Sequence, residues 1–490
     1  MKKHFTLISI ILIIILGAAV YANSLSGKFV WDDHLLIGDN VYIESWANLP
    51  KIFTSGITAG ARVIENSFYR PLQIVTYLIN YSLWGLNPGG YHLTNIILHI
   101  IVAICIYQFV NLLFSDSALA LLTGIFFVVH PVHTEAVTYI SGRADSLSAI
   151  FLLFCLIYYI RTVHIESPKA YFFISLSYTA ALLSKENSLI LPLILLFYHY
   201  AFRVKINIKK ISLISSITII YIILRFVVFR NFMPEIENKG SFLQTVPGFF
   251  AAITSYVRLL FVPFDLHMEY GNRLFSFTHP AVISGALITV SSLAVAFIKR
   301  KNNKILFFGV GWFFIMFIPV ANIYRVNSSY MMEHWLYLPS IGFFLICSMA
   351  LRFLYRKKNF QAQTVIITIA LLAFYSYLTI KQNDYWSDEV TFYERTLKYK
   401  PTNPKIYFNL GLVYENNGRK QNAINAYKKA LELNPNYFLA HNNLAVAYYE
   451  EKKYDLAIKH CDKALELGYQ VHPEFLELLK PYRKSLGQNK

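Results

Sequence analysis

The sequence predicts an all-α membrane protein of about 11 transmembrane helices, followed by a C-terminal array of short helical repeats. Hydrophobic residues make up 56% of the 490 residues and charged residues only 15%. A soluble domain cannot bury that much apolar surface, so lipid must cover much of it. Many apolar runs approach the length that spans a bilayer, and a period of about 34 residues appears near the C-terminus.

The candidate spans follow from apolar runs of about 20 residues. They are 5–22, 92–114, 118–140, 146–162, 170–184, 187–203, 211–229, 280–298, 304–322, 336–353 and 363–380. The first follows Lys2 and Lys3 and has no convincing cleavage site after it, so we interpret it as an uncleaved helix with a cytoplasmic N-terminus.

The apolar stretch 249–264 is ambiguous, and charge decides how we interpret it. Basic clusters stay on the cytoplasmic side, which places 203–210 and 299–304 there. An even number of spans must separate the two clusters, and 211–229 and 280–298 already supply two. We therefore expect 249–264 to lie in the interface or to re-enter, and the C-terminal tail to lie outside.

The formal net charge of +17 does not indicate nucleic-acid binding. Much of the Lys and Arg lies in short clusters between apolar runs, where it orients the chain and meets anionic headgroups. The partners we expect are therefore the bilayer and no nucleic acid. Three of the four cysteines lie inside apolar runs and the fourth in the tail, which is neither a disulfide framework nor a metal site.

The composition becomes that of a soluble domain after Lys381. Tyr407, Gly411 and Tyr427 in one copy, and Leu444 and Ala464 in the next, fit the pattern of a tetratricopeptide repeat. The predicted domains are 1–381 (membrane domain), 382–403 (linker and degenerate half repeat), 404–437 and 438–471 (repeats), and 472–490 (capping helix and tail).

The long polar segment 23–91, which we expect to be an outer loop, contains the adjacent carboxylates Asp32 and Asp33. Two carboxylates at a membrane surface are costly unless they are paired or used. One could accept the proton of an attacking hydroxyl, and the other could orient it or hold a cation. A cap or a surface salt bridge would also explain them. Arg70, later in the segment, could grip a phosphate or reach toward lipid headgroups.

The segment from His130 to Asp145 carries several polar candidates at the end of the third span. His130 and His133, with Glu135 after them, could bind a metal. A metal site needs a third ligand that converges with the two histidines, and none can be located in the sequence, so we predict no metal site. Hydrogen bonding to a sugar, a phosphate or the Asp pair is the preferred interpretation. Arg143 and Asp145 could contact substrate, or pair with each other and cap the next helix.

Two further pairs lie at outer turns. Lys185 and Glu186 interrupt apolar spans, where the lysine could neutralise a phosphate or the pair could be structural. Glu333 and His334 precede Trp335 and Tyr337, and we include both among the candidate residues that bind the donor phosphate or the substrate. An aromatic belt accounts for the two aromatic residues but not for Glu333.

The order of these segments resembles the transmembrane and tetratricopeptide-repeat-containing protein O-mannosyltransferase family and its bacterial relatives among the GT-C glycosyltransferases. The segments that carry the resemblance are the Asp pair, Tyr-Arg-Pro-Leu at 69–72, His-Pro-Val-His-Thr-Glu-Ala-Val at 130–137, Gly-Arg-Ala-Asp at 142–145, Lys-Glu at 185–186, and Leu-Tyr-Leu-Pro-Ser at 336–340. Two features depart from the family: His334 stands where Arg is common, and the repeat array is short.

The resemblance implies a GT-C fold and an inverting transfer of mannose or another hexose from a polyprenyl-phosphate donor to an acceptor hydroxyl, such as Ser or Thr of a polypeptide, outside the cytoplasm. Asp32 or Asp33 would be the base, and Arg70, Arg143 and Lys185 would stabilise the phosphate. The repeats would bind the acceptor or a partner protein. No cofactor is implied with certainty, and a divalent cation stays open. The short, Ile- and Lys-rich chain suggests a bacterial cytoplasmic membrane rather than the endoplasmic reticulum of the animal relatives.

Two other functions are consistent with membrane spans joined to repeats. An O-antigen-type polymerase or ligase would be expected to carry a very large outer loop late in the chain, whereas here the longest one, 23–91, comes first. A non-enzymatic membrane-anchored scaffold needs only one span and no charges at the membrane edge.

Overall fold

The computed structural model describes residues 2–61, 68–229, 241–271, 273–323 and 329–487. All regular elements in these ranges are helices, so the all-α prediction is confirmed. The chain divides into two compact units, 1–387 and 388–490. The division falls a few residues after Lys381, where the composition changes.

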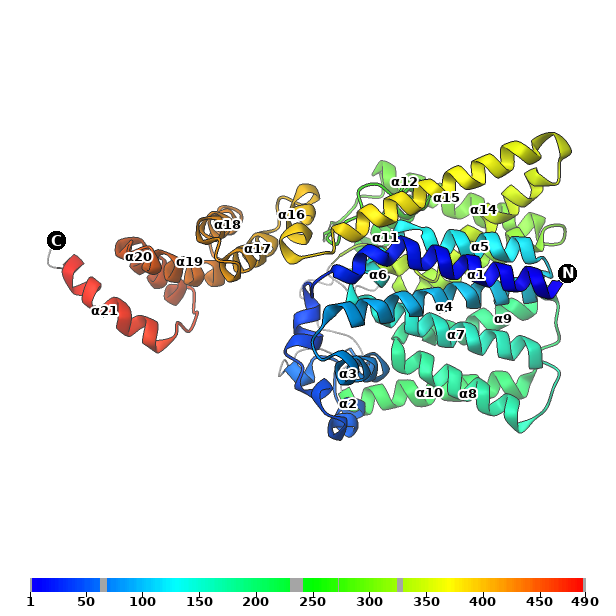
Figure 1. Ribbon diagram of the computed structural model, residues 1–490, viewed down its shortest axis with the longest axis horizontal. Helices are drawn as coiled ribbons and strands as arrows, with labels where there is room; N and C mark the ends of the chain where they lie inside the picture. The colour runs from blue at the N-terminus through cyan, green and yellow to red at the C-terminus, as the bar shows by residue number, and fades with distance from the viewer. Residues whose placement is uncertain (1, 62–67, 230–240, 272, 324–328, 488–490) are drawn as a thin grey trace. The chain divides into compact units, whose positions relative to one another are not determined.

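The membrane unit is a bundle of helices that correspond to the predicted spans (Figure 1). They are α1 (Lys2–Tyr21), α4 (Pro88–Phe114), α5 (Ser117–Val129), α7 (Arg143–Thr162), α8 (Pro168–Ser184), α9 (Leu191–Phe202), α10 (Ile208–Phe229), α12 (Pro280–Lys299), α13 (Lys304–Phe317), α14 (Ser340–Tyr355) and α15 (Gln361–Asp384). Six helical segments of the described chain are long and apolar enough to cross a membrane alone, so about 11 spans stays a prediction.

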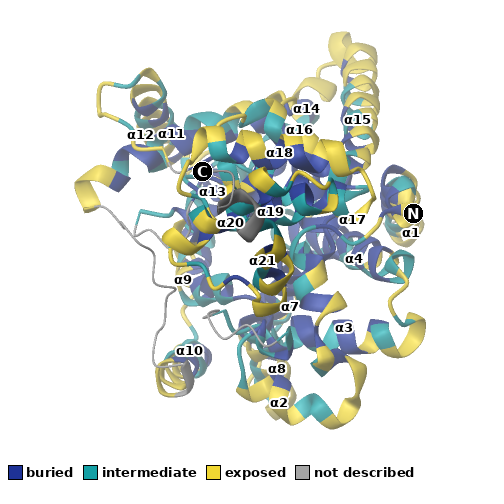
Figure 2. Ribbon diagram, turned by 90° about the vertical axis from the view of Figure 1, so that its left-hand side faces the viewer, coloured by how far each residue is buried: buried dark blue, intermediate teal, exposed yellow. Residues whose placement is uncertain are grey.

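Several of these helices expose apolar side chains outward, as lipid-facing helices do. Only 22% of the apolar window of α10, and 17% of those of α12 and α15, is buried. Their outward surfaces appear as exposed ribbon in Figure 2. Apolar surface on this scale is covered by lipid in a multi-pass membrane protein.

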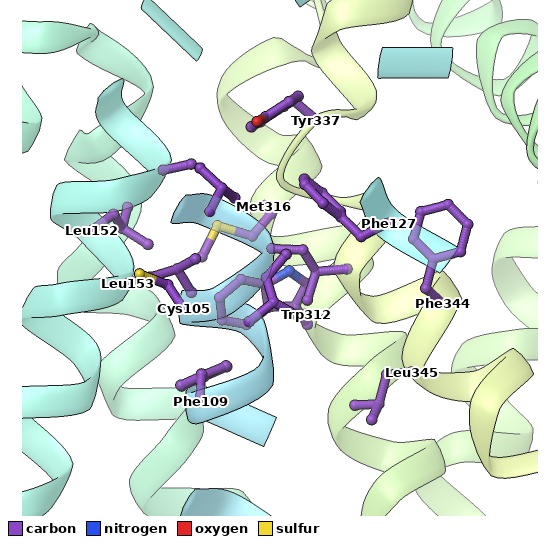
Figure 3. Close-up of a cluster of buried hydrophobic side chains, with 14 of the residues drawn as sticks. Cys105, Phe109, Phe127, Leu152, Leu153, Trp312, Met316, Tyr337, Phe344 and Leu345 are labelled. Carbon is purple, nitrogen blue, oxygen red and sulfur yellow. The ribbon is translucent and has the colours of Figure 1, made fainter. Parts of the chain in front are cut away.

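The buried core lies where α4, α5, α7, α13 and α14 meet (Figure 3). Phe109 packs against Trp312 with ring centroids 5.3 Å apart. The indole N–H of Trp312 donates to the Leu338 carbonyl at 2.8 Å, so this buried polar group is satisfied. Gly309 and Gly342 let α13 and α14 approach closely, as small residues do in membrane bundles.

The predicted span 118–140 is not one continuous helix. It ends at Val129, and the helix axis bends by 57° at the break before a short helical segment that includes α6 (Thr134–Val137). Pro131 causes the break because it lacks a backbone N–H and cannot continue the hydrogen-bond ladder. The bend carries Glu135 to the end of the bundle.

The segment 23–91 is more ordered than the expected outer loop. It contains α2 (Leu49–Thr54) and α3 (Pro71–Trp84) and has a small core of its own, which includes Ile43, Ile74 and Tyr77. The Gln73 side chain donates to the Ser141 carbonyl at 2.9 Å. This contact fastens the segment to the start of α7.

Helix α11 (Phe242–Phe261) contains most of the ambiguous stretch 249–264. Four of its hydrogen bonds join Thr245 to Ile323, Thr254 to Ala281, Tyr256 to Met332 and Leu260 to His130. All four partners lie at the end of the bundle where α13 ends and α12 and α14 begin. A helix that crossed the bundle would contact both ends, so this geometry favours the predicted interfacial or re-entrant position.

The second unit consists of α16 (Glu389–Tyr399), α17 (Pro404–Asn416), α18 (Lys420–Leu433), α19 (Phe438–Glu450), α20 (Tyr454–Glu466) and α21 (Pro473–Gly487). Gly411 of α17 packs beside the Tyr427 ring of α18, and a Cβ atom there would lie 2.4 Å from the ring. The small residue at this position of the repeat therefore lets the two helices pair closely.

The approach of α13 to α14 predicts a sharp penalty for one added methyl group. A Cβ on Gly342 would lie 2.2 Å from the Gly309 carbonyl oxygen, and backbone cannot move aside cheaply. We expect Gly342→Ala to destabilise the bundle by about 1–3 kcal/mol. Gly248→Ala on α11, where the nearest atom is 4.0 Å away, is the control. Thermal unfolding in detergent measures both, and equal transition temperatures would contradict this packing.

Candidate active site

A cavity of about 1000 Å³ lies at the end of the bundle where the segment 23–91 packs. Its walls come from the end of α10 and the starts of α3, α7 and α11, together with the turns after α8 and α13 and before α14. Seven predicted site residues line it: Asp32, Arg70, Glu135, Asp145, Lys185, Glu186 and His334. Residues far apart in the sequence therefore share one space.

Asp32 lines the cavity, and the backbone immediately before it is unusual. Trp31 has φ = 55°, in the left-handed region that bulky residues rarely adopt. Its ring stacks on Tyr139, 5.8 Å between centroids, and Tyr139 stacks in turn on Trp386 at 5.2 Å. The stack holds the strained turn, and such strain is typical of functional positions.

Asp33 points away from the cavity and is almost fully buried. Its carboxylate accepts hydrogen bonds from the Ser141 N–H at 2.9 Å, the Ser141 hydroxyl at 2.5 Å and the Val30 N–H at 3.1 Å. Burial raises the pKa of Asp33 to about 7 against the lowering effect of these hydrogen bonds. Of the predicted pair, only Asp32 lines the cavity, whereas Asp33 ties the segment to the turn before α7.

Arg70 and Glu186 form a two-point ion pair at the cavity wall. Arg70 Nη2 donates to one carboxylate oxygen of Glu186 at 2.6 Å, and Nε donates to the other at 3.1 Å. Burial alone would raise the pKa of Glu186, but the guanidinium outweighs it and lowers this pKa to about 2. The pair is therefore ionised, and it fixes Arg70 in place.

Lys185 pairs with Asp145 rather than with its neighbour Glu186. Its ammonium donates to an Asp145 oxygen at 2.6 Å, and less than a tenth of either side chain is exposed. The interpretation that Arg143 pairs with Asp145 is therefore wrong, because Asp145 lies against the turn after α8.

Arg143 is fully buried and holds three helices together. It donates to Asn95 at 2.6 Å, Asn80 at 2.6 Å and the Tyr91 carbonyl at 2.9 Å, and its guanidinium lies 4.7 Å from the centre of the Tyr77 ring. It does not line the cavity, so the structure does not bring it to a phosphate bound there. The hydrogen-bond partners of this cation are neutral amide groups. The spacing of residues in the sequence could not predict them.

His130 and His133 are also core residues. Nε2 of His130 donates to the Leu260 carbonyl at 3.1 Å. His133 hydrogen bonds to the Phe127 carbonyl at 2.8 Å and the Ser340 hydroxyl at 3.0 Å. Neither lines the cavity, so the expected contact with a sugar or phosphate is not formed there. Within the described ranges, no group of three His, Cys, Asp or Glu side chains is placed to hold a metal ion.

Glu135 and His334 form a third pair at the cavity. Glu135 accepts hydrogen bonds from the His334 backbone N–H and from ring Nδ1, both at 2.8 Å. Glu333 is buried away from the cavity and accepts from the His267 N–H and the Tyr270 hydroxyl, each at 2.6 Å. Glu333 therefore anchors the loop before α12, and His334 faces the cavity.

Sequence reasoning missed Trp31, Tyr139 and Arg225, which also line the cavity. Arg225 lies near the end of α10, inside the apolar run 211–229. An arginine within such a run is costly and commonly functional, so that signal was available. The stacking of Trp31 on Tyr139 joins distant segments and had no signal in the sequence.

The raised pKa of Asp33 predicts how stability depends on pH. The folded state holds the proton to about pH 7, whereas an unfolded Asp loses it near pH 3.8. The stabilising contribution is therefore present below about pH 4 and disappears as pH rises to about 7. We expect the thermal stability of the wild type relative to Asp33→Asn to fall between pH 4.5 and 7.5. Asp39→Asn, an exposed carboxylate of the same segment, is the control. A constant difference from Asp33→Asn across this range would contradict the account.

Two family models match the chain. The model described as dolichyl-phosphate-mannose-protein mannosyltransferase matches residues 72–229, and the tetratricopeptide repeat model matches 404–437 and 438–467. The first match covers much of the membrane unit around the cavity. The second coincides with the two predicted repeats, except for the end of the last.

Curated relatives agree with these matches. A protein O-mannosyl-transferase of Caenorhabditis elegans is 28% identical over 85% of this chain and 61% of its own length. The human protein O-mannosyl-transferase TMTC3 is 26% identical over 86% of this chain and 51% of its own. The chain thus spans about half to three fifths of the length of these relatives.

Among solved structures, ArnT from Cupriavidus metallidurans bound to undecaprenyl phosphate has a TM-score of 0.45 at 14% identity. The match covers 86% of this chain and 75% of the ArnT chain. The Archaeoglobus fulgidus oligosaccharyltransferase tethered with an acceptor peptide has a TM-score of 0.48 at 15% identity, covering 79% and 56%. The family models and the curated relatives confirm the resemblance inferred from the sequence. The chain is related to the transmembrane and tetratricopeptide-repeat protein O-mannosyl-transferases.

Proposed function

We propose that this protein transfers a hexose, mannose being the first candidate, from a polyprenyl-phosphate donor to a hydroxyl of an acceptor such as a polypeptide. The observation that carries the proposal is the cavity, where Asp32 shares one space with Arg70 and Lys185 in an otherwise apolar bundle. Ionisable groups gathered at the edge of a membrane are costly, and they mark functional sites. The related O-mannosyl-transferases support the class of reaction.

The cavity wall suits both parts of such a donor. Arg70 and Lys185 offer positive charge to a phosphate, and each is held in a fixed position by its own carboxylate partner. Apolar side chains, among them Leu189, Ile318 and Val320, line the same cavity and suit the start of a lipid chain. Pre-positioned cations stabilise developing negative charge without having to reorganise during the reaction.

Asp32 is the proposed base. Its carboxylate takes the proton of the acceptor hydroxyl, and the hydroxyl oxygen forms a bond to the anomeric carbon. The bond from that carbon to the phosphate oxygen breaks, and its electron pair leaves with the polyprenyl phosphate. Attack opposite to the leaving group inverts the anomeric configuration. Asp33 acts through position only, because it holds the turn on which Asp32 stands.

We further propose that the cavity faces away from the cytoplasm of a bacterial cell. The basic clusters 203–210, 299–304 and 352–358 lie at the opposite ends of the helices, and such clusters stay on the cytoplasmic side. Helix α15 begins after the third cluster and ends where Asp384 accepts a hydrogen bond from Asn23 at 2.8 Å. The chain therefore leaves the membrane unit on the cavity side, and the repeats that follow could bind the acceptor or a partner protein.

The proposed base predicts a large loss of activity from one neutral substitution. Asp32→Asn keeps the shape of the side chain but cannot take a proton, so transfer should fall about 100-fold or more. Asp39→Asn in the same segment, exposed and away from the cavity, should transfer at the wild-type rate. The assay is hexose transfer from a polyprenyl-phosphate sugar to hydroxyl-bearing peptides in membranes, read by mass spectrometry. Wild-type transfer by Asp32→Asn would reject Asp32 as the base.

A further inference from the structure

His334 lies at the cavity with one ring nitrogen already occupied. Nδ1 donates to Glu135 at 2.8 Å, because a carboxylate oxygen can only accept. No hydrogen bond of Nε2 is found among the described residues, and 21% of the side chain is exposed where it lines the cavity. Nε2 is therefore the atom that His334 can offer to a bound molecule.

Glu135 needs a cation. Only 2% of its side chain is exposed, and both of its hydrogen bonds come from His334. A buried carboxylate is strongly destabilised unless a positive charge or a proton compensates it. The His334 ring lies against this carboxylate at 2.8 Å and is the basic group that can supply the charge at close range.

The other charged and titratable groups around the pair already have partners. Lys185, whose charge also acts on Glu135, is held by Asp145. Glu333, next in sequence, accepts from Tyr270, and the Tyr256 hydroxyl donates to the Met332 carbonyl. His334 is therefore the basic group most closely tied to Glu135.

We propose that His334, protonated and oriented by Glu135, donates its Nε2–H to an oxygen of the phosphate group of a polyprenyl-phosphate lipid in this cavity. The inference rests on the proposed function and adds a third phosphate-binding cation to Arg70 and Lys185. Lipid binding should therefore depend on the charge that the side chain at position 334 can carry.

The test is the binding of undecaprenyl phosphate to the full-length protein in detergent, compared between variants at one fixed pH. His334→Arg keeps a positive charge at this position and should bind at least as tightly as the wild type. His334→Gln, which cannot carry a charge, should bind about tenfold more weakly.

Glu135→Gln separates the proposed role from a purely structural one. Without the carboxylate that orients the ring, lipid binding should weaken, so Glu135→Gln should lower the affinity of the wild type but add little in the His334→Gln background. His164→Gln, an exposed histidine at the opposite end of the bundle, should bind as the wild type does. Thermal unfolding of each variant identifies any that fail to fold. If His334→Gln fails to fold, the affinity of His334→Arg for undecaprenyl phosphate tests the role of His334.

The outcomes distinguish the two proposals. Wild-type protein that binds no undecaprenyl phosphate would overturn both the proposed function and the role of His334. Equal affinity for the lipid in the wild type, His334→Arg and His334→Gln would overturn the role of His334 alone. Binding that follows the charge at position 334 supports it.

Discussion

Burial of charge is the constraint on which this end of the bundle depends. An isolated ionised group among apolar helices is costly, and each buried charge needs a partner. Three pairs satisfy this need at the cavity: Arg70 with Glu186, Lys185 with Asp145, and His334 with Glu135. Each pair joins two separate parts of the chain, so the same contacts that neutralise charge also hold the cavity open in a fixed shape.

The segment 23–91 forms part of the cavity wall, and the buried carboxylate of Asp33 helps to hold it in place. Asp33 accepts from the Ser141 backbone and hydroxyl, and Gln73 donates to the Ser141 carbonyl. Both contacts are made to the turn before α7, next to Arg143, which fastens α7 to α3 and α4. The predicted Asp pair thus divides into two roles, in which Asp33 builds the site and Asp32 faces the reactants.

The apolar runs and the repeat period predict the helices well, because lipid and helix pairing impose simple local patterns. Pro131 itself indicated the break in the helix, although the predicted span 118–140 ran through it. The partners of Arg143, Lys185 and His334 could not be predicted, because a pairing between residues 40 or more positions apart leaves no trace in spacing. His130 and His133 fit a substrate role by residue type, yet burial makes them core residues.

A structure of the full-length protein with undecaprenyl phosphate, determined by electron cryo-microscopy, tests the central claim most directly. The account predicts phosphate density in the cavity within hydrogen-bond distance of Arg70, Lys185 or His334, with the lipid chain leaving along the apolar wall. The basic cluster 299–304 at the other end of the bundle would attract any anionic lipid. Phosphate density there, with the cavity empty, would contradict the account.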